Sequence, residues 1–124
     1  MIKLISLLLG GMLGTLARYG LAGVTYRAMG SHFPHGTLAV NLTGCFLIGF
    51  FAVLAETKFL LGPNARLLLM VGFCGAFTTF STFILESANL IRDGETLRAF
   101  LNVVGSVVLG FIFFRLGILF GESI

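Results

Sequence analysis

Charge is scarce in this chain, which has eight Lys and Arg and five Asp and Glu among 124 residues, or 10% charged. A soluble domain carries about 25% charged residues, so the composition excludes an ordinary soluble domain. The basic residues stand singly, which excludes a nucleic-acid-binding patch and a polybasic lipid-binding tail. Tryptophan is absent, and the two histidines and two cysteines form no ligand cluster. Without a nucleophile beside a base or a pair of carboxylates at workable spacing, an enzyme is not expected.

Apolar residues are abundant instead, at 57% of the chain with a mean hydropathy of +1.05. A helix that crosses a bilayer needs about 20 mostly apolar residues, and the sequence holds four such windows. They predict an all-α membrane protein with a single transmembrane domain (residues 1–124) and helices at about 2–26, 34–55, 66–92 and 96–121. Transmembrane strands would alternate polar and apolar residues, and these windows do not. We therefore expect a multi-pass protein embedded in the lipid bilayer.

The basic residues give no orientation signal. Four lie toward the side of the termini and four toward the other side: Lys3, Lys58, Arg66 and Arg115 against Arg18, Arg27, Arg92 and Arg98. An excess of Lys and Arg normally marks the cytoplasmic side. One explanation of the balance is dual topology, in which the chain pairs with an inverted copy of itself as an antiparallel homodimer. The other explanation is a weak bias that one span decides.

The first window combines a packing motif with a buried charge. Gly10 and Gly14 form a small-x-x-x-small pair that lets another helix approach closely. Arg18 follows one turn later, where a guanidinium is costly in lipid and usually faces protein or water. It can form an electropositive vestibule that attracts anions, or it can extend its charged end to the surface.

Two further windows carry polar residues at four-residue spacing. Thr37 and Asn41 share one face of the second window, and an amide in hydrocarbon needs hydrogen-bond partners. Asn41 therefore joins two helices or lines a hydrated path. Asn102 and Ser106 form a similar stripe in the fourth window, which suits a channel wall or a helix contact. Glu86, a carboxylate near the end of the third window, is expected either to pair with a basic residue or to face the vestibule, and it receives no role in transport.

The third window contains the most informative segment, residues 72–83 with the sequence GFCGAFTTFSTF. Glycine and threonine weaken a helix, so we expect a break near residues 75–79. The free carbonyls at the end of a half-helix suit a hard cation such as sodium. In the alternative interpretation, the Ser and Thr hydroxyls bond back within an intact helix.

Aromatic and hydroxyl side chains interleave in the same segment. Phe80 and Phe83 are expected to share a helix face with Phe77, beside the hydroxyls of Ser81 and Thr82. A phenyl ring has a positive edge, so rings presented edge-on can hold a small anion. The alternative is ordinary core or lipid-facing phenylalanine, which is common in a chain with 14 Phe residues.

Three motifs together resemble the Fluc (CrcB-type) family of fluoride ion channels, and the resemblance covers essentially the whole chain. They are Gly10-Gly11-x-x-Gly14-x-x-x-Arg18-Tyr19, then Gly36-Thr37-Leu38-x-Val40-Asn41 with Gly44, and Gly72-Phe73-Cys74-Gly75-x-Phe77-Thr78-Thr79-Phe80-Ser81-Thr82-Phe83.

The resemblance implies a fluoride-selective channel in a bacterial inner (plasma) membrane that exports fluoride passively, lowers cytoplasmic fluoride and gives fluoride resistance. It also implies an antiparallel homodimer with two pores and a central structural sodium ion, which is not transported, on the backbone carbonyls of Gly75 and Thr78 from both subunits. Arg18 would lie near the pore entrance. The implied pore residues are Asn41, Phe80, Phe83 and Ser106, with Thr37, Ser81, Thr82 and Asn102 beside them. Asn102 stands where many family members have an aromatic or imidazole group.

Two other functions remain as alternatives. A small dual-topology proton-coupled exporter needs a carboxylate buried in its first helix, and the first window here contains none. A non-transporting assembly subunit would need the glycine-rich packing but not the polar residues Arg18 and Asn41.

Overall fold

The computed structural model describes residues 1–124 and is entirely helical. Its elements, in chain order, are α1 (Ile2–Met29), α2 (His35–Ala52), the π-helical η1 (Val53–Thr57), α3 (Pro63–Arg66), the π-helical η2 (Leu67–Cys74), α4 (Gly75–Phe77), α5 (Phe80–Arg92) and α6 (Thr96–Ser123). They make four spans that are long and apolar enough to cross a membrane. The prediction of four apolar helical spans is therefore confirmed.

The ends of the spans differ slightly from the expected bounds. The first helix was expected to end near residue 26 but runs to Met29, and Gly30 ends it with a φ of 82°. Glycine adopts this left-handed conformation without steric cost. The second span begins at His35, after Pro34, and reaches Thr57 through η1. The apolar windows were shorter than the helices because polar residues such as Arg27 continue the last helical turn.

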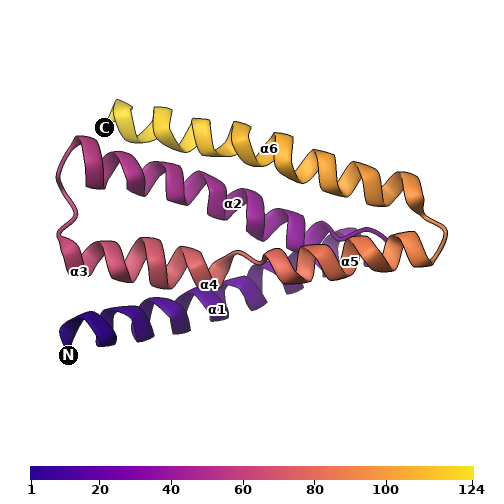
Figure 1. Ribbon diagram of the computed structural model, residues 1–124, viewed down its shortest axis with the longest axis horizontal. Helices are drawn as coiled ribbons and strands as arrows, with labels where there is room; N and C mark the ends of the chain where they lie inside the picture. Colours follow the sequence, from indigo (N-terminus) through magenta and orange to yellow (C-terminus); the bar gives the residue numbers. More distant parts are fainter.

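The spans form two pairs that meet near the middle of the molecule. Figure 1 shows α2 beside α6, and α1 beside the segments of the third span that precede α5, with both termini at one end. The three connections are short, so consecutive spans run in opposite directions. The segments of the third span that precede α5 lie between α1 and α2, whereas α5 packs against α6.

Small residues set the spacing between α1 and η2. A Cβ atom on Gly10 would lie 2.1 Å from the carbonyl oxygen of Leu68, and one on Gly14 would lie 2.3 Å from that of Phe73. Both distances are shorter than any real contact of a Cβ atom, and the atoms they would strike belong to the rigid backbone. The Gly10 and Gly14 pair thus lies where the two backbones approach most closely, as small residues do in membrane helix contacts.

This contact predicts opposite effects for two neighbouring glycines. Gly10→Ala should lower the free energy of unfolding by about 1 to 3 kcal/mol, because overpacking forces the backbones apart. Gly11→Ala is the matched control, since a Cβ atom there meets nothing within 4 Å. Alanine also favours the helix over glycine by about 1 kcal/mol. Thermal unfolding of both variants in detergent measures the difference, and equal stabilities would contradict the packing described here.

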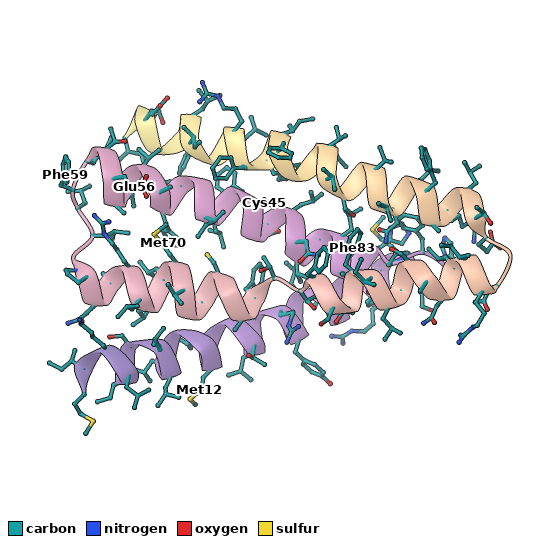
Figure 2. The ribbon with its side chains drawn as sticks, viewed as in Figure 1. Met12, Cys45, Glu56, Phe59, Met70 and Phe83 are labelled. Atoms are coloured by element: carbon teal, nitrogen blue, oxygen red, sulfur yellow. The ribbon has the colours of Figure 1, made fainter.

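Few side chains are buried within the single chain. Only 22 of 124 residues are buried, and large apolar side chains cover the outside of α1 and α6. Met12, for example, is 61% exposed and points away from the bundle in Figure 2. Such continuous apolar surface is unfavourable in water and ordinary in contact with lipid. The fold is that of a multi-pass membrane protein.

The connection between α2 and α3 is held by one arginine. The Arg66 guanidinium donates to the carbonyl oxygen of Ala55 at 2.6 Å and to that of Leu61 at 3.1 Å. Between them, Phe59 has a φ of 53° and is 79% exposed at the tip of the loop (Figure 2). The guanidinium therefore satisfies carbonyls that the end of η1 and the loop leave free.

Candidate functional site

The third span is interrupted between α4 and α5. Thr78 has φ and ψ of −87° and 159°, and Thr79 has −148° and 116°, so both residues are extended rather than helical. The amide of Thr79, which a continued helix would direct to the carbonyl of Gly75, donates instead to Asn41 Oδ1 at 2.8 Å. Two adjacent residues in the middle of an apolar span thus leave the helical hydrogen-bond pattern.

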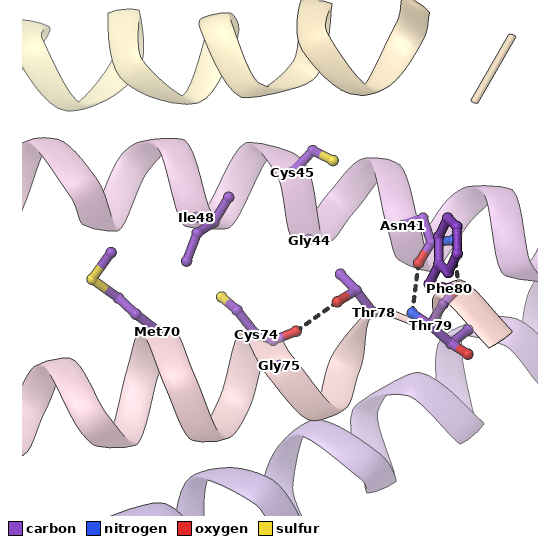
Figure 3. A pocket seen from close by; sticks show the side chains of 10 residues that line it. All are labelled: Asn41, Gly44, Cys45, Ile48, Met70, Cys74, Gly75, Thr78, Thr79 and Phe80. Carbon is purple, nitrogen blue, oxygen red and sulfur yellow. Dashed lines mark hydrogen bonds between the residues drawn. The ribbon is translucent and has the colours of Figure 1, made fainter. Parts of the chain in front are cut away.

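Asn41 of α2 satisfies both backbone groups of Thr79. Its Nδ2 atom donates to the Thr79 carbonyl at 3.0 Å while its Oδ1 atom accepts from the Thr79 amide (Figure 3). An amide side chain has two N–H donors, so one donor of Asn41 remains for another partner. Asn41 therefore joins α2 to the third span and also keeps a free donor beside the interruption.

Thr79 also begins α5. Its Oγ1 atom accepts from the amide of Thr82 at 3.3 Å and donates to Thr82 Oγ1 at 3.0 Å, which is the pattern of an N-terminal cap. The N-terminus of a helix carries a partial positive charge. The interruption therefore presents the positive end of the 13-residue α5 to its surroundings, and this favours an anion there.

A cavity of about 400 Å³ lies against the interruption, between α2 and the third span, and we call it the interruption cavity. Figure 3 shows its lining residues, which include Asn41, Gly75, Thr78, Thr79 and Phe80. Gly75 is exposed on the surface of the chain. A Cβ atom on Gly44 would lie 2.1 Å from Thr78 Cγ2, so glycine is needed for α2 to pass the interruption.

Phe80 and Phe83 lie together on α5. Their ring centroids are 5.9 Å apart at an interplanar angle of 49°. Phe80 is 74% exposed, whereas Phe83 is only 7% exposed. The prediction that they share a helix face with Phe77 is wrong, because Thr78 and Thr79 separate the helices. Phe77 belongs to α4 and stacks on Phe73, with centroids 5.5 Å apart.

A second cavity, of about 470 Å³, lies among α1, α2 and α5, and we call it the vestibule cavity. Its polar lining residues include Arg18, Tyr26, Thr37, Thr82 and Glu86. The ion pairs of the chain, Arg92 with Asp93 and Arg98 with Glu95, lie at the connection between α5 and α6. No ion pair therefore joins the Arg18 guanidinium to Glu86, the carboxylate in the same cavity.

Hydroxyl groups hold Glu86 in the vestibule cavity, and one of them belongs to Tyr26, which the sequence did not single out. The Tyr26 hydroxyl donates to Glu86 Oε2 at 2.6 Å, and the Thr37 hydroxyl donates to Glu86 Oε1. Of the two alternatives for Glu86, an ion pair with a basic residue or a place in the vestibule, the structure shows the second. Nothing in the sequence marked Tyr26.

The remaining predicted pore residues are Ser106, Asn102 and Ser81. Ser106 lines a cavity of about 380 Å³ with Cys45 and Gly110, which we call the serine cavity. Asn102 is 2% exposed and donates to Ser87 Oγ at 2.9 Å, so it lies in the contact between α5 and α6. Ser81 is exposed on α5. Asn102, Ser81 and Phe83 line none of the cavities.

Neighbouring cavities share wall residues. Thr79 lines both the vestibule cavity and the interruption cavity, and Cys45 lines both the interruption cavity and the serine cavity. Glu86 also lines a polar cavity of about 350 Å³ at the loops between α1 and α2 and between α5 and α6. These four cavities are therefore adjacent in series, in the order from the loops to Ser106, with a shared residue at each boundary.

Comparison with known proteins gives a uniform result. The family model described as "CrcB-like protein, Camphor Resistance (CrcB)" matches residues 5–118. A protein of Desulforapulum autotrophicum is 45% identical over 98% of both chains. One of Opitutus terrae is 49% identical over 88% of this chain and 84% of its own, and one of Aquifex aeolicus is 46% identical over 94% of both. All three relatives are named fluoride-specific ion channel FluC.

The match therefore extends over nearly the whole chain and includes all four spans. It covers α1 with Arg18, the asparagine of α2, the interrupted third span and most of α6. On this similarity, the chain belongs to the CrcB-like protein family.

Proposed function

We propose that this protein is a fluoride-selective ion channel that lets fluoride leave the cell passively, lowers cytoplasmic fluoride and so gives fluoride resistance. The observation that carries the proposal is the series of cavities with shared wall residues, lined by hydroxyl, amide and aromatic groups from all four spans. The names of the relatives support fluoride as the ion. A channel needs no catalytic residue, and none is assigned.

In this proposal Arg18 and the positive end of α5 attract the anion into the vestibule cavity. Fluoride holds its water strongly, so selectivity requires donors that replace the hydration shell and still allow exit. In the cavities, the free N–H of Asn41, the hydroxyls of Thr37, Thr82 and Ser106 and the ring edge of Phe80 would supply them. Ser81, Phe83 and Asn102 line none of the cavities of the single chain, so in this proposal they would act beside the path, as Phe83 does where its ring meets that of Phe80. Carbonyl groups alone would repel the anion.

The complete pore requires a second copy in this proposal. Phe80 and Gly75 are exposed on the single chain, and the interruption cavity is open on one side. The balance of four basic residues against four permits insertion in both directions. An antiparallel homodimer in a bacterial plasma membrane would close the cavities against an inverted copy.

A structural sodium ion fits the same arrangement. The residues that would hold it are Gly75 and Thr78 through their backbone carbonyls, because the amide of Thr79 no longer points to the carbonyl of Gly75. Carbonyl oxygens are hard donors that suit sodium. One chain offers two such oxygens, and an inverted copy would offer two more. When bound, the ion would neutralise the carbonyl dipoles at the centre of the dimer without entering the pore.

Efflux from proteoliposomes tests the proposal. With a potassium carrier to balance charge, liposomes loaded with potassium fluoride should lose fluoride rapidly, and those loaded with chloride should lose little. A pH gradient should leave the fluoride rate unchanged, which separates a passive channel from a proton-coupled exporter. Protein prepared with N-methylglucamine in place of sodium should lose activity, and full activity there would contradict the sodium site. Equal loss of chloride and fluoride would contradict the proposed function.

A further inference from the structure

Tyr26 reaches from the end of α1 to a carboxylate on α5. Its hydroxyl donates to Glu86 Oε2 at 2.6 Å and lies 3.4 Å from the hydroxyl oxygen of Thr37. The ring passes directly over Gly36, where a Cβ atom would lie 2.3 Å from Tyr26 Cε2. A glycine at residue 36 is thus what gives the tyrosine its path to Glu86.

The Glu86 carboxylate is held by hydroxyl groups alone. Tyr26 and Thr37 each donate to one of its oxygens, and no basic residue forms an ion pair with it. A hydrogen bond to a charged group is stronger than one between neutral groups. The two hydroxyls therefore keep the carboxylate at the wall that the vestibule cavity shares with the polar cavity of about 350 Å³ at the loops.

This arrangement creates a competition for the proton of Thr37. A threonine hydroxyl has one proton to donate, and the structure directs it to Glu86 Oε1. The proposed function needs the same proton for fluoride. Two anions, the carboxylate and the fluoride ion, thus compete for one donor.

We propose that Tyr26 is a positioning residue that sets this competition. By donating to Glu86 Oε2 it offsets part of the carboxylate charge and limits how strongly Oε1 retains the proton of Thr37. Fluoride can then take that donor as it passes. The inference rests on the proposed function and adds to it a residue of α1 that acts through Glu86.

Substitution of the tyrosine hydroxyl tests the inference. In Tyr26→Phe the carboxylate should hold the Thr37 hydroxyl more tightly. The fluoride concentration that gives half-maximal efflux should therefore rise about tenfold, because one hydrogen bond to a charged group contributes at least a factor of about ten in binding. The maximal rate of fluoride efflux should change by a smaller factor than this concentration does. Thr25→Val is the matched control, because the Thr25 hydroxyl of the same helical turn bonds only to the carbonyl of Leu21.

A double variant separates positioning from packing. In the Glu86→Gln background the charged competitor is gone, so adding Tyr26→Phe should change the half-saturating concentration by less than about twofold. An equally large effect in both backgrounds would overturn the inference, as would an unchanged value in Tyr26→Phe alone. Absence of fluoride efflux from the unmodified protein would instead overturn the proposed function, and with it this inference.

Discussion

Asn41→Leu is expected to abolish fluoride efflux and to destabilise the protein. Leucine has a similar volume but cannot pair with the amide and carbonyl of Thr79, which Asn41 satisfies at 2.8 and 3.0 Å. Leaving two buried backbone groups unpaired costs about 2 to 6 kcal/mol. Efflux should fall to the rate of empty liposomes, and the melting temperature in detergent should fall with it.

The control for this variant lies on the same helix. Thr43→Val removes a half-buried hydroxyl from α2, two residues beyond Asn41, at a position that takes part in neither bond to Thr79. The efflux rate and the melting temperature of Thr43→Val should equal those of the unmodified protein. Normal stability of Asn41→Leu together with normal efflux would show that the interruption does not depend on Asn41.

Phe80→Ile is expected to abolish fluoride efflux while leaving the fold and the assembly unchanged. The Phe80 ring is 74% exposed on the single chain, so its replacement removes little packing within the chain. Isoleucine is apolar and lacks the positive ring edge that would face an anion. A fluoride electrode measures the efflux, and chemical cross-linking in the membrane reports the assembly.

Phe100→Ile is the comparison for this variant, since Phe100 is 61% exposed on α6 and lines none of the cavities. Its efflux should equal that of the unmodified protein. If Phe80→Ile conducted fluoride as well as Phe100→Ile does, the aromatic part of the mechanism would be wrong.

The four spans could be predicted because hydropathy is a local property of the sequence. Each apolar window corresponds to one span of the structure, and only the ends differ by a few residues. The segment of residues 75–79 was likewise marked by its glycine and threonine content. Composition could not show that Asn41, 38 residues away in sequence, pairs with the backbone of Thr79.

The polar contacts between distant spans were beyond sequence reasoning. Tyr26 and Glu86 are 60 residues apart, and a tyrosine near a helix end is ordinary at a membrane surface. Helical spacing also misplaced Phe77, because periodicity assumes a continuous helix and Thr78 and Thr79 interrupt it. Asn102 was left open between a wall and a contact, and its bond to Ser87 places it in a contact.

The pairing of Asn41 with Thr79 makes the two residues unequal in what they tolerate. Asn41 recognises the main chain of Thr79, and every residue except proline provides that amide and carbonyl. The side chain at residue 79 caps α5 and lines two cavities, and neither role involves Asn41. A serine at residue 79 would therefore keep both bonds to Asn41, whereas a change of Asn41 breaks them whichever residue stands at 79.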